Sequence, residues 1–362
     1  MTWNGTEKVS PAALLRRSTD IVYGLEARKL FKGKRILVTG AGGSIGSEIV
    51  RQLINLGAGM IHFVDGDEYA LYMLQRGLTD TALLDDSRFI LARVENAQRI
   101  NTILGEIKPE IVIHAAAHKH LPLLERSPEA AILSNVIGTH VVADACVRHG
   151  VDRFINISTD KAARPTSVLG WTKRLAEMAV ASYTDSDTTV ASVRFGNVFG
   201  SRGSFVETLV QQVSTGKSVM ITDPMATRYF MTIPEAASLV IEAAVIAQNG
   251  GTYVLDMGEP VSIVELVHRF VELTGYRMPQ IMFTGLRPGE KLHEELYDPT
   301  EDRQSTVHPR ISTVTLPGVL DKEEINELRM LIEENDVSPE KLRSRLIALV
   351  ALHSTAPLLL EV

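Results

Sequence analysis

Residues 35–48 read RILVTGAGGSIGSE, and this stretch decides the fold. The run Arg35–Thr39 is short, apolar and β-rich, which predicts a buried strand. Four glycines (40, 42, 43 and 46) follow it directly and precede a helix-period stretch, Ile45–Leu56. Glycines at these points permit a tight turn and a close backbone approach to a pyrophosphate, which the helix N-terminus attracts through its free N–H groups. The order of strand, glycine turn and helix therefore predicts a dinucleotide site, with a plain glycine-rich loop as the alternative.

The alternation of strands and helices continues beyond this motif. Strand-like runs lie at 60–65, 88–93, 111–115, 153–158 and 190–195, and helix-period runs lie between them at 69–78, 97–107, 128–149 and 170–183. Strands that alternate with helices of this length are typical of a parallel sheet covered on both faces. We therefore expect an α/β protein with a Rossmann-type, doubly wound parallel sheet.

Composition argues against several classes of protein. The net charge of −7 does not suit a nucleic-acid surface. The single cysteine, Cys146, excludes a disulfide framework and fits a reducing compartment. We find no targeting segment and no apolar run near the roughly 20 residues that span a bilayer. We therefore expect a cytoplasmic protein without a membrane span.

Asp65 ends the strand expected at 60–65, about twenty residues after the glycines. A carboxylate at this place accepts hydrogen bonds from the adenosine ribose and repels a 2′-phosphate, which favours NAD as the cofactor. Asp67 and Glu68 add negative charge, and no neighbouring arginine balances a 2′-phosphate. A solvated loop acid is the alternative interpretation of Asp65.

Six longer motifs make the chain recognisable: TGAGGSIGSE (39–48), HAAAHKHLPLLE (114–125), STDKAARPTSVLGWTK (158–173), RFGNVFGSRGS (194–204), DPMATRYFM (223–231) and RPGEKLHEEL (287–296). Together they resemble the extended short-chain dehydrogenase/reductases, and within them the nucleotide-sugar 4,6-dehydratases and epimerases of capsule, flagellin-glycan and O-antigen synthesis. The resemblance covers residues 14 to 299. The chain resembles the cytoplasmic part of larger, membrane-anchored UDP-N-acetylglucosamine 4,6-dehydratases that keep NAD bound, here without the membrane helices.

The expected organisation has four parts. An N-terminal helical segment (1–33) precedes an NAD-binding Rossmann domain (34–200). A smaller C-terminal α/β lobe (201–318) binds the UDP-sugar and exchanges elements with the Rossmann domain. The tail (319–362) forms two helices, one opening at Asp321 and the other with Ser338 as N-cap and Pro339 at its first position.

The resemblance implies binding roles position by position. Residues expected at the cofactor are Thr39, Gly40, Gly43, Ser44, Ile45, Gly46, Asp65, Ala115, Ala116, Ala117 and Lys173. Residues expected at the UDP-sugar are Lys119, His120, Asn197, Arg228, Arg287 and Glu290. Of these, Asn197 and the two arginines match diphosphate-binding positions, and Glu290 matches the position near the uridine ribose. Forked arginine donors suit a diphosphate, although surface ion pairs are the alternative.

The catalytic residues implied by the resemblance are Thr159, Asp160, Lys161 and Lys173. A 4,6-dehydratase moves a hydride from sugar C4 to NAD, eliminates water across C5 and C6, and returns the hydride to C6. Asp160 would protonate the leaving C6 hydroxyl, and Lys161 would remove the C5 proton. A free aspartate titrates near ~3.9 and a free lysine near ~10.4, so the site must shift both pKa values.

Two positions depart from the wider family. Leu169 stands where most short-chain enzymes have a catalytic tyrosine, as an apolar residue does in the larger dehydratases. The acceptor of the C4 hydroxyl proton therefore stays open between Thr159, a bound water and Lys173. Arg93 stands where relatives usually place an aspartate near the adenine, which puts that contact in doubt.

Three other functions compete with the dehydratase. A C4 epimerase shares the fold and the cofactor but needs no acid–base pair at C5 and C6. A nucleotide-sugar-binding homologue that has lost catalysis fits the missing tyrosine. The third alternative is a metalloenzyme, because His114, His118 and His120 are closely spaced. No carboxylate cluster accompanies them, so we expect no metal. By resemblance we also expect a homodimer or higher oligomer, formed through the helices at 128–149 and 170–183.

Overall fold

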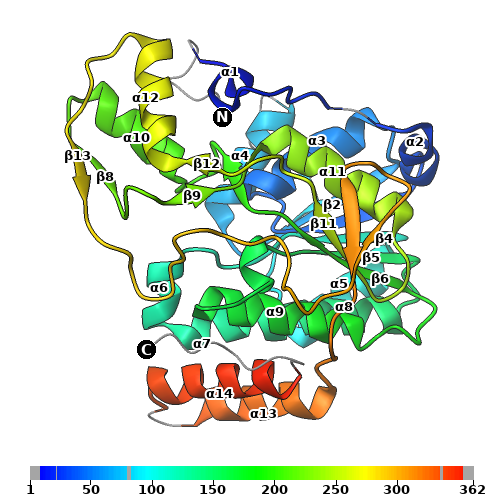
Figure 1. Ribbon diagram of the computed structural model, residues 1–362. Helices are drawn as coiled ribbons and strands as arrows, with labels where there is room; N and C mark the ends of the chain where they lie inside the picture. Colours follow the sequence, from blue (N-terminus) through cyan, green and yellow to red (C-terminus); the bar gives the residue numbers. More distant parts are fainter. Residues whose placement is uncertain (1–8, 22, 80–82, 335–336, 354–362) are drawn as a thin grey trace.

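The computed structural model describes residues 9–21, 23–79, 83–334 and 337–353, which form an α/β fold around one large sheet (Figure 1). The described chain places nine strands in this sheet, in the order β14-β15-β11-β6-β5-β4-β1-β2-β3. Seven of them are parallel: β1 (Arg35–Thr39), β2 (Met60–Asp65), β3 (Phe89–Leu91), β4 (Ile111–His114), β5 (Arg153–Ile157), β6 (Thr189–Arg194) and β11 (Gly251–Leu255). The order 3-2-1-4-5-6 is that of the Rossmann fold, which confirms the predicted fold class.

The sheet continues beyond the expected strands. β15 (Ile311–Val314) pairs antiparallel with β11, and β14 (Arg303–Ser305) pairs antiparallel with β15. β14 could not be predicted from the sequence, because its residues are polar and all exposed and so show no apolar alternation. Residues from the predicted substrate lobe thus complete the edge of the main sheet.

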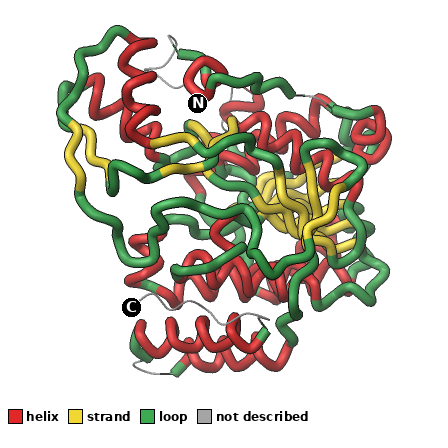
Figure 2. The backbone as a smooth tube through the Cα atoms, viewed as in Figure 1, coloured by secondary structure: helices red, strands yellow, loops and turns green. Residues whose placement is uncertain are grey.

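Helices cover both faces of the sheet. Leu37 belongs to the same buried cluster as α5 (Ala97–Ile107) and α9 (Val168–Ala181). Its neighbours Ile36 and Val38 belong to the opposite cluster with α2 (Leu25–Phe31), α3 (Ser44–Asn55), α4 (Glu68–Thr79) and α11 (Ile233–Ile246). This alternation is the period of two that a strand buried on both faces requires. Figure 2 shows the strands of the large sheet gathered between the helices.

A third cluster of buried residues lies beside the carboxyl ends of the strands. It joins α1 (Pro11–Leu15), α10 (Phe205–Ser214) and α12 (Ile263–Thr274). The described chain also forms three two-stranded sheets that are separate from the main sheet: β7 (Asn197–Phe199) with β10 (Phe230–Thr232), β9 (Thr227–Arg228) with β12 (Val261–Ser262), and β8 (Val219–Ile221) with β13 (Ile281–Phe283). The domain boundaries at 33, 200 and 318 stay predictions.

One continuous helical stretch passes the length and apolarity of a membrane span, against the expectation from the sequence. It runs through α7 (Pro128–Ala131), a π-helical turn (Ile132–Ile137) and α8 (Gly138–Arg148), and its most apolar window is 72% buried. The stretch packs against α5 and α9 in the core. Its apolar character is therefore explained by burial inside the fold, which makes it weak evidence for a span.

The C-terminal helices α13 (Lys322–Glu333) and α14 (Pro339–Leu352) have the predicted N-caps, Asp321 and Ser338. They pack against α7, the π-helical turn and α9, as Figure 1 shows below α9. Every residue of α9 is buried, because α14, α8, the π-helical turn and β6 all pack against this helix. A second subunit could use α9, as the sequence predicted, only by displacing α14, so the oligomeric state stays a prediction.

Candidate active site

The glycine-rich loop between β1 and α3 leaves no room for side chains. Gly40 has a φ of +63°, and a Cβ added there would lie 2.5 Å from the Ala116 nitrogen. A Cβ on Gly46 would lie 2.2 Å from the Gly40 oxygen. The loop therefore packs tightly against the end of β4 and leads into the twelve-residue α3 at Ser44. Such a bare backbone before a helix N-terminus fits a dinucleotide pyrophosphate.

Thr39 lies beneath this loop and not at its surface. Its side chain is fully buried, and its Oγ1 is hydrogen-bonded to His114 Nδ1 at 2.7 Å. His114 Nε2 is also hydrogen-bonded to Thr139 Oγ1 at 3.1 Å, and burial lowers the pKa of His114 to about 3. Thr39 therefore joins β1 to β4 through this hydrogen bond, and its expected contact with the cofactor stays a prediction. His114 is a neutral core histidine, a role that competes with the metal interpretation.

Asp65 ends β2 beside the loop, as expected. Its two carboxylate oxygens accept the backbone N–H groups of Gly42 at 2.9 Å and Asp67 at 3.0 Å. Burial raises the pKa of Asp65 from its usual value. A half-buried carboxylate at the end of β2, beside the glycine loop, is the arrangement that recognises an adenosine ribose.

Arginines do approach this region, contrary to the expectation from the local sequence. Arg202 Nη2 donates to the Gly42 oxygen at 2.5 Å, and its backbone N–H donates to Ser44 Oγ at 3.1 Å. Arg93 lies against Gly66 and pairs with Glu95, with 74% of its side chain exposed. Arg202 is 160 residues from Gly42, so only the fold brings it to the loop.

A cluster of charged side chains lies at the carboxyl end of β5. Asp160 and Lys161 are in the short helix η2 (Asp160–Ala162), and Lys161 Nζ lies 3.0 Å from Asp160 Oδ1. Thr159 Oγ1 donates to the same oxygen at 2.9 Å. Glu294 Oε1 lies 3.3 Å from Lys161 Nζ. The Asp160 side chain is fully buried and Lys161 is 21% exposed, so Lys161 is the member of the pair that solvent or substrate reaches.

Burial and charge shift the pKa values in this cluster in different directions. Burial raises the pKa of Asp160, as a catalytic acid requires. Burial acts to lower the pKa of Lys161, but the negative charges of Asp160 and Glu294 outweigh it and raise that pKa. The direction for Lys161 is opposite to the one a catalytic base needs. The ammonium form of Lys161 is therefore the stable form in this structure.

The strand end that carries this cluster is held by a buried ionic network. Ser158 Oγ donates to Glu177 Oε1 at 2.6 Å, and Arg194 donates to both Glu177 oxygens at 2.7 Å. Arg194 also binds both oxygens of Glu301 at 2.8 Å. Because every member is paired, the network orders the ends of β5 and β6 without leaving an uncompensated charge.

The helix α9 supplies Lys173 and Leu169. Lys173 Nζ donates to the Ile157 oxygen at 2.6 Å, and burial lowers its pKa to about 8. Leu169 is 6% exposed and belongs to the core. The structure therefore puts Lys173 directly beside the end of β5, and leaves an apolar contact where other short-chain enzymes have a phenol.

The residues expected at the UDP-sugar fall into two groups. Asn197 Oδ1 lies 3.4 Å from Lys161 Nζ, and Arg228 Nε lies 4.0 Å from Glu294, so both border the charged cluster. Arg287 instead pairs with Glu290 at 2.7 Å, with 55% of its side chain exposed. Arg287 and Glu290 thus bind each other in this structure, and their contact with a nucleotide stays a prediction.

Lys119 and His120 lie beside the loop that carries Arg202. Lys119 Nζ donates to Ser201 Oγ at 3.3 Å, and a Cβ on Gly203 would lie 2.5 Å from His120 Cε1. Both residues are exposed and lie against residues 201–203. Ala115, Ala116 and Ala117 lie in the same segment after β4, and Ala115 N donates to the Thr39 oxygen at 3.0 Å.

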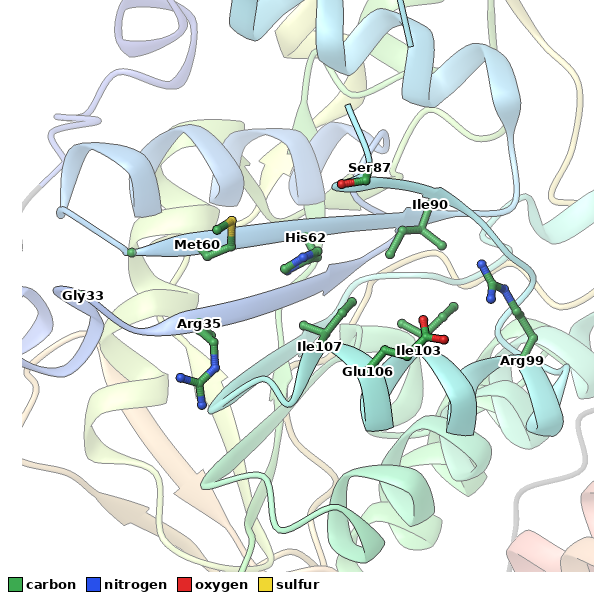
Figure 3. Close-up of a pocket in the computed structure, with 11 residues that line it drawn as sticks. Gly33, Arg35, Met60, His62, Ser87, Ile90, Arg99, Ile103, Glu106 and Ile107 are labelled. Carbon is green, nitrogen blue, oxygen red and sulfur yellow. The ribbon is translucent and has the colours of Figure 1, made fainter. Parts of the chain in front are cut away.

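A separate cavity of about 580 Å³ lies at the opposite end of the sheet (Figure 3). It is lined by Arg35, Met60 and His62, at or near the amino ends of β1 and β2, and by Arg99 and Glu106 of α5. Ligands of open α/β sheets bind at the carboxyl ends of the strands, so this cavity is not part of the candidate site. Among the described residues, no group of three His, Cys, Asp or Glu side chains is placed to hold a metal ion.

Comparisons with known proteins agree with this geometry. Residues 36–316 match the family model described as polysaccharide biosynthesis protein. The chain belongs to this family. It is 42% identical to the capsular polysaccharide biosynthesis protein CapD of Staphylococcus aureus, over 94% of this chain and 57% of that protein. The chain thus spans little more than half the length of that relative.

Two further relatives perform different reactions. The chain is 30% identical to an inverting UDP-N-acetylglucosamine 4,6-dehydratase of Campylobacter jejuni, over 73% of this chain and 78% of that enzyme. It is equally identical to a UDP-glucose 4-epimerase of Rickettsia rickettsii, over 75% of this chain and 80% of that enzyme. The family is therefore one of nucleotide-sugar dehydratases and epimerases, and identity alone does not separate the two reactions.

Solved structures share the fold. Pen from Bacillus thuringiensis superposes with a TM-score of 0.72 at 30% identity, covering 83% of this chain and 99% of that protein. MoeE5, solved in complex with UDP-glucuronic acid and NAD, superposes with a TM-score of 0.61 at 26% identity, covering 73% of this chain and 90% of that protein. These two structures therefore share the Rossmann-type fold of this chain.

The sequence singled out most of this site but missed Glu294 and Arg202. Both lie inside motifs that carry the resemblance, RPGEKLHEEL and RFGNVFGSRGS. Glu294 is followed by Glu295, and the sequence does not show which of the two faces Lys161. Their roles depend on contacts between segments more than a hundred residues apart.

Proposed function

We propose that the chain is an NAD-dependent UDP-N-acetylhexosamine 4,6-dehydratase, with UDP-N-acetylglucosamine as its substrate. The observation that carries this proposal is the buried pair of Asp160 and Lys161 at the carboxyl end of β5, joined at 3.0 Å. Elimination of water across C5 and C6 needs an acid and a base side by side. Epimerisation at C4 does not, so the pair favours dehydration over the reaction of the Rickettsia relative.

The glycine loop, the N-terminus of α3 and the carboxylate of Asp65 fit NAD. The loop would hold the pyrophosphate, Asp65 the adenosine ribose and Lys173 the nicotinamide ribose. NAD, when bound, supplies the acceptor and later the donor of the C4 hydride. A cofactor and a substrate of this kind suit the cytoplasm, which is the compartment we propose.

Thr159 and Asp160 would handle the first proton. The C4 hydroxyl gives its proton to Thr159 Oγ1 while the Thr159 proton moves to Asp160 Oδ1, along the hydrogen bond of 2.9 Å. Asp160 is then a carboxylic acid and gives this proton to the C6 hydroxyl, which leaves as water. Of the three acceptors left open by the sequence, Thr159 is favoured because it is already bound to the acid. The Lys173 ammonium is instead directed to the Ile157 oxygen.

Lys161 would take the proton from C5 and later return it to the same carbon. Its side chain is the exposed member of the pair, and Asn197, at 3.4 Å, helps to orient Nζ. Arg228, 11% exposed and beside the cluster, would bind the diphosphate. The forked donors of a guanidinium group suit the anionic oxygens of a diphosphate.

Incubation with UDP-N-acetylglucosamine and mass spectrometry test the proposal. Dehydration gives a product lighter by one water. An unchanged mass with a new stereoisomer would establish the epimerase instead, and no turnover of any UDP-sugar would favour a binding protein.

A further inference from the structure

The cluster around Lys161 contains one carboxylate more than this reaction sequence uses. Glu294 is 4% exposed at its side chain, and its Oε2 is buried with no hydrogen-bond partner in the part of the chain that the structure describes. The adjacent Glu295 is 39% exposed and pairs with Arg164 at 2.8 Å and Lys291 at 3.7 Å. A buried, half-satisfied carboxylate is costly, so its position beside Lys161 calls for a function that Glu295 does not need.

The segment that carries Glu294 is fixed beside β9. Leu292 O accepts the Thr227 N–H at 3.1 Å and Arg228 Nη1 at 3.0 Å, and Thr227 Oγ1 is hydrogen-bonded to His293 Nδ1 at 2.8 Å. Three hydrogen bonds over two residues hold the backbone in one place. Glu294 is therefore presented to Lys161 by an ordered segment, which is what a precise proton contact requires.

The proposed function does not yet say which group accepts the proton that Lys161 must lose before it can act as a base. Lys161 is an ammonium group in the resting structure, and an ammonium group does not remove a proton from C5. Asp160 is not free to accept the Lys161 proton, because it carries the proton that came from C4 through Thr159. Glu294 Oε1, at 3.3 Å, is the other carboxylate oxygen within reach of Nζ among the described residues.

On the basis of the dehydratase proposed above, we propose that Glu294 is a positioning residue that fixes Lys161 Nζ and accepts its ammonium proton. One N–H bond of Lys161 breaks and one O–H bond of Glu294 forms, which leaves an amine on Lys161. This amine takes the C5 proton and later gives it back to C5. Glu294 then returns its proton to Lys161, so the enzyme ends in the state in which it began.

The charges around the pair explain when the transfer occurs. Lys161 faces Asp160 from η2, Glu294 from the 287–296 segment and Arg228 from β9. Glu294 faces Lys161, Arg228 and Lys291, whose positive charges outweigh burial and lower its pKa. Protonation of Asp160 removes one of the two negative charges that keep Lys161 charged. The pKa of Lys161 then falls, which makes transfer of its proton to Glu294 easier, so oxidation at C4 prepares the base for C5.

The test compares Glu294→Gln with Glu294→Asp and with Glu295→Gln as the matched control. We measure kcat for UDP-N-acetylglucosamine between pH 6 and pH 10, with melting temperature and bound NAD for each protein. Glu294→Gln should lose roughly 10²-fold in kcat near neutral pH, the scale of a lost proton transfer. Its kcat should then rise with pH, because Lys161 must lose its proton to solvent. Glu294→Asp keeps a carboxylate and should keep the wild-type shape of the profile, and Glu295→Gln should resemble the wild type.

A purely structural role for Glu294 predicts a different result. Glu294→Gln would then lose activity by the same factor at every pH, or keep it throughout, and either outcome overturns the inference. If the wild type turns over no UDP-sugar, the proposed function fails on its own. The inference is then decided by NMR titration of Lys161 Nζ, because Glu294→Gln must lower the Lys161 pKa, and an unchanged pKa refutes the contact.

Discussion

Two substitutions in the charged cluster should both remove catalysis but should differ in their effect on the stability of the fold. Asn at position 160 keeps the shape of Asp160, and its amide oxygen can still accept from Thr159 and Lys161, which bind Oδ1 at 2.9 Å and 3.0 Å in the native protein. The fully buried carboxylate is lost together with its desolvation cost. We expect Asp160→Asn to fold normally, to bind NAD, and to lose ~10²-fold or more in turnover, the usual scale for a catalytic acid.

Lys161→Ala should also be inactive, because it removes the base, and it should destabilise the fold. It leaves Asp160 and Glu294 buried without their shared cation, and removal of one partner from a buried ion pair costs about 3–5 kcal/mol. Without the cation, burial raises the pKa of Asp160 still further above its value in the unfolded chain. Groups with raised pKa values stabilise the fold below the unfolded pKa and lose this contribution as pH rises through the folded pKa. Lys161→Ala should therefore be closest to wild-type stability in mild acid and fall behind it towards neutral pH.

Three measurements on the same preparations test these predictions. They are turnover by mass spectrometry, the amount of NAD released on denaturation, and thermal melting at pH 5 and pH 8. Leu169→Ala is the matched control within the site, because it removes an apolar side chain and no proton carrier. It should lose much less turnover than either charged variant, provided that it folds. A well-folded, NAD-loaded Asp160→Asn protein that dehydrates the sugar at a near-normal rate would refute the assignment of Asp160 as the acid. If Lys161→Ala loses the same stability at both pH values, the Lys161 cation does not offset the buried carboxylate charges in the way argued above.

Three other predictions follow from the site and its surroundings. Nucleotide released from the denatured protein should be mainly NAD, because the proposed contact of Asp65 with the adenosine ribose would repel a 2′-phosphate. A preparation that releases mainly NADP contradicts this role, and Arg202 is then the first residue to test. Titration calorimetry with UDP should show a loss of ~2–4 kcal/mol for Arg228→Ala, the range for a charge-assisted contact, and a smaller loss for Arg287→Ala, whose side chain is 55% exposed; unchanged affinity in both variants excludes the diphosphate assignment. Deletion of residues 319–362 should uncover the apolar surface of α9. Ultracentrifugation should then detect self-association beyond that of the full chain. A truncated chain that is as monodisperse as the full chain contradicts this prediction.

The sequence predicted the large parallel sheet well because its signals are local. The strands at 35–39 and 60–65 and the helix at 97–107 have the expected bounds. Their apolar periods and the glycines between them act over a few residues. The capping residues Asp321 and Ser338 were readable for the same reason, since a cap and its helix are adjacent in the chain. The edge strand β14 was missed because it is short, polar and exposed.

The active-site residues were predictable by type, but their electrostatic state was not. Asp160 and Lys161 are adjacent in sequence, whereas Glu294, the second carboxylate that raises the Lys161 pKa, is 133 residues away. The same limit applies to Thr39, because the motif does not show that its side chain is hydrogen-bonded to His114. A motif indicates which chemistry a site holds. The direction of each pKa shift depends on burial and on charges that only the folded chain brings together.

The missing tyrosine and the extra carboxylate are connected by this electrostatic argument. In a short-chain enzyme with a tyrosine, the phenol beside the lysine takes the C4 hydroxyl proton, and the acid and base at C5 and C6 are free for the elimination. Here Leu169 takes no proton, and in the proposed mechanism Asp160 receives the C4 proton through Thr159. Asp160 then no longer compensates the charge of Lys161, and a second carboxylate within reach of Nζ becomes necessary. Glu294, buried at 3.3 Å from Nζ on a segment fixed beside β9, has the position that this requirement specifies.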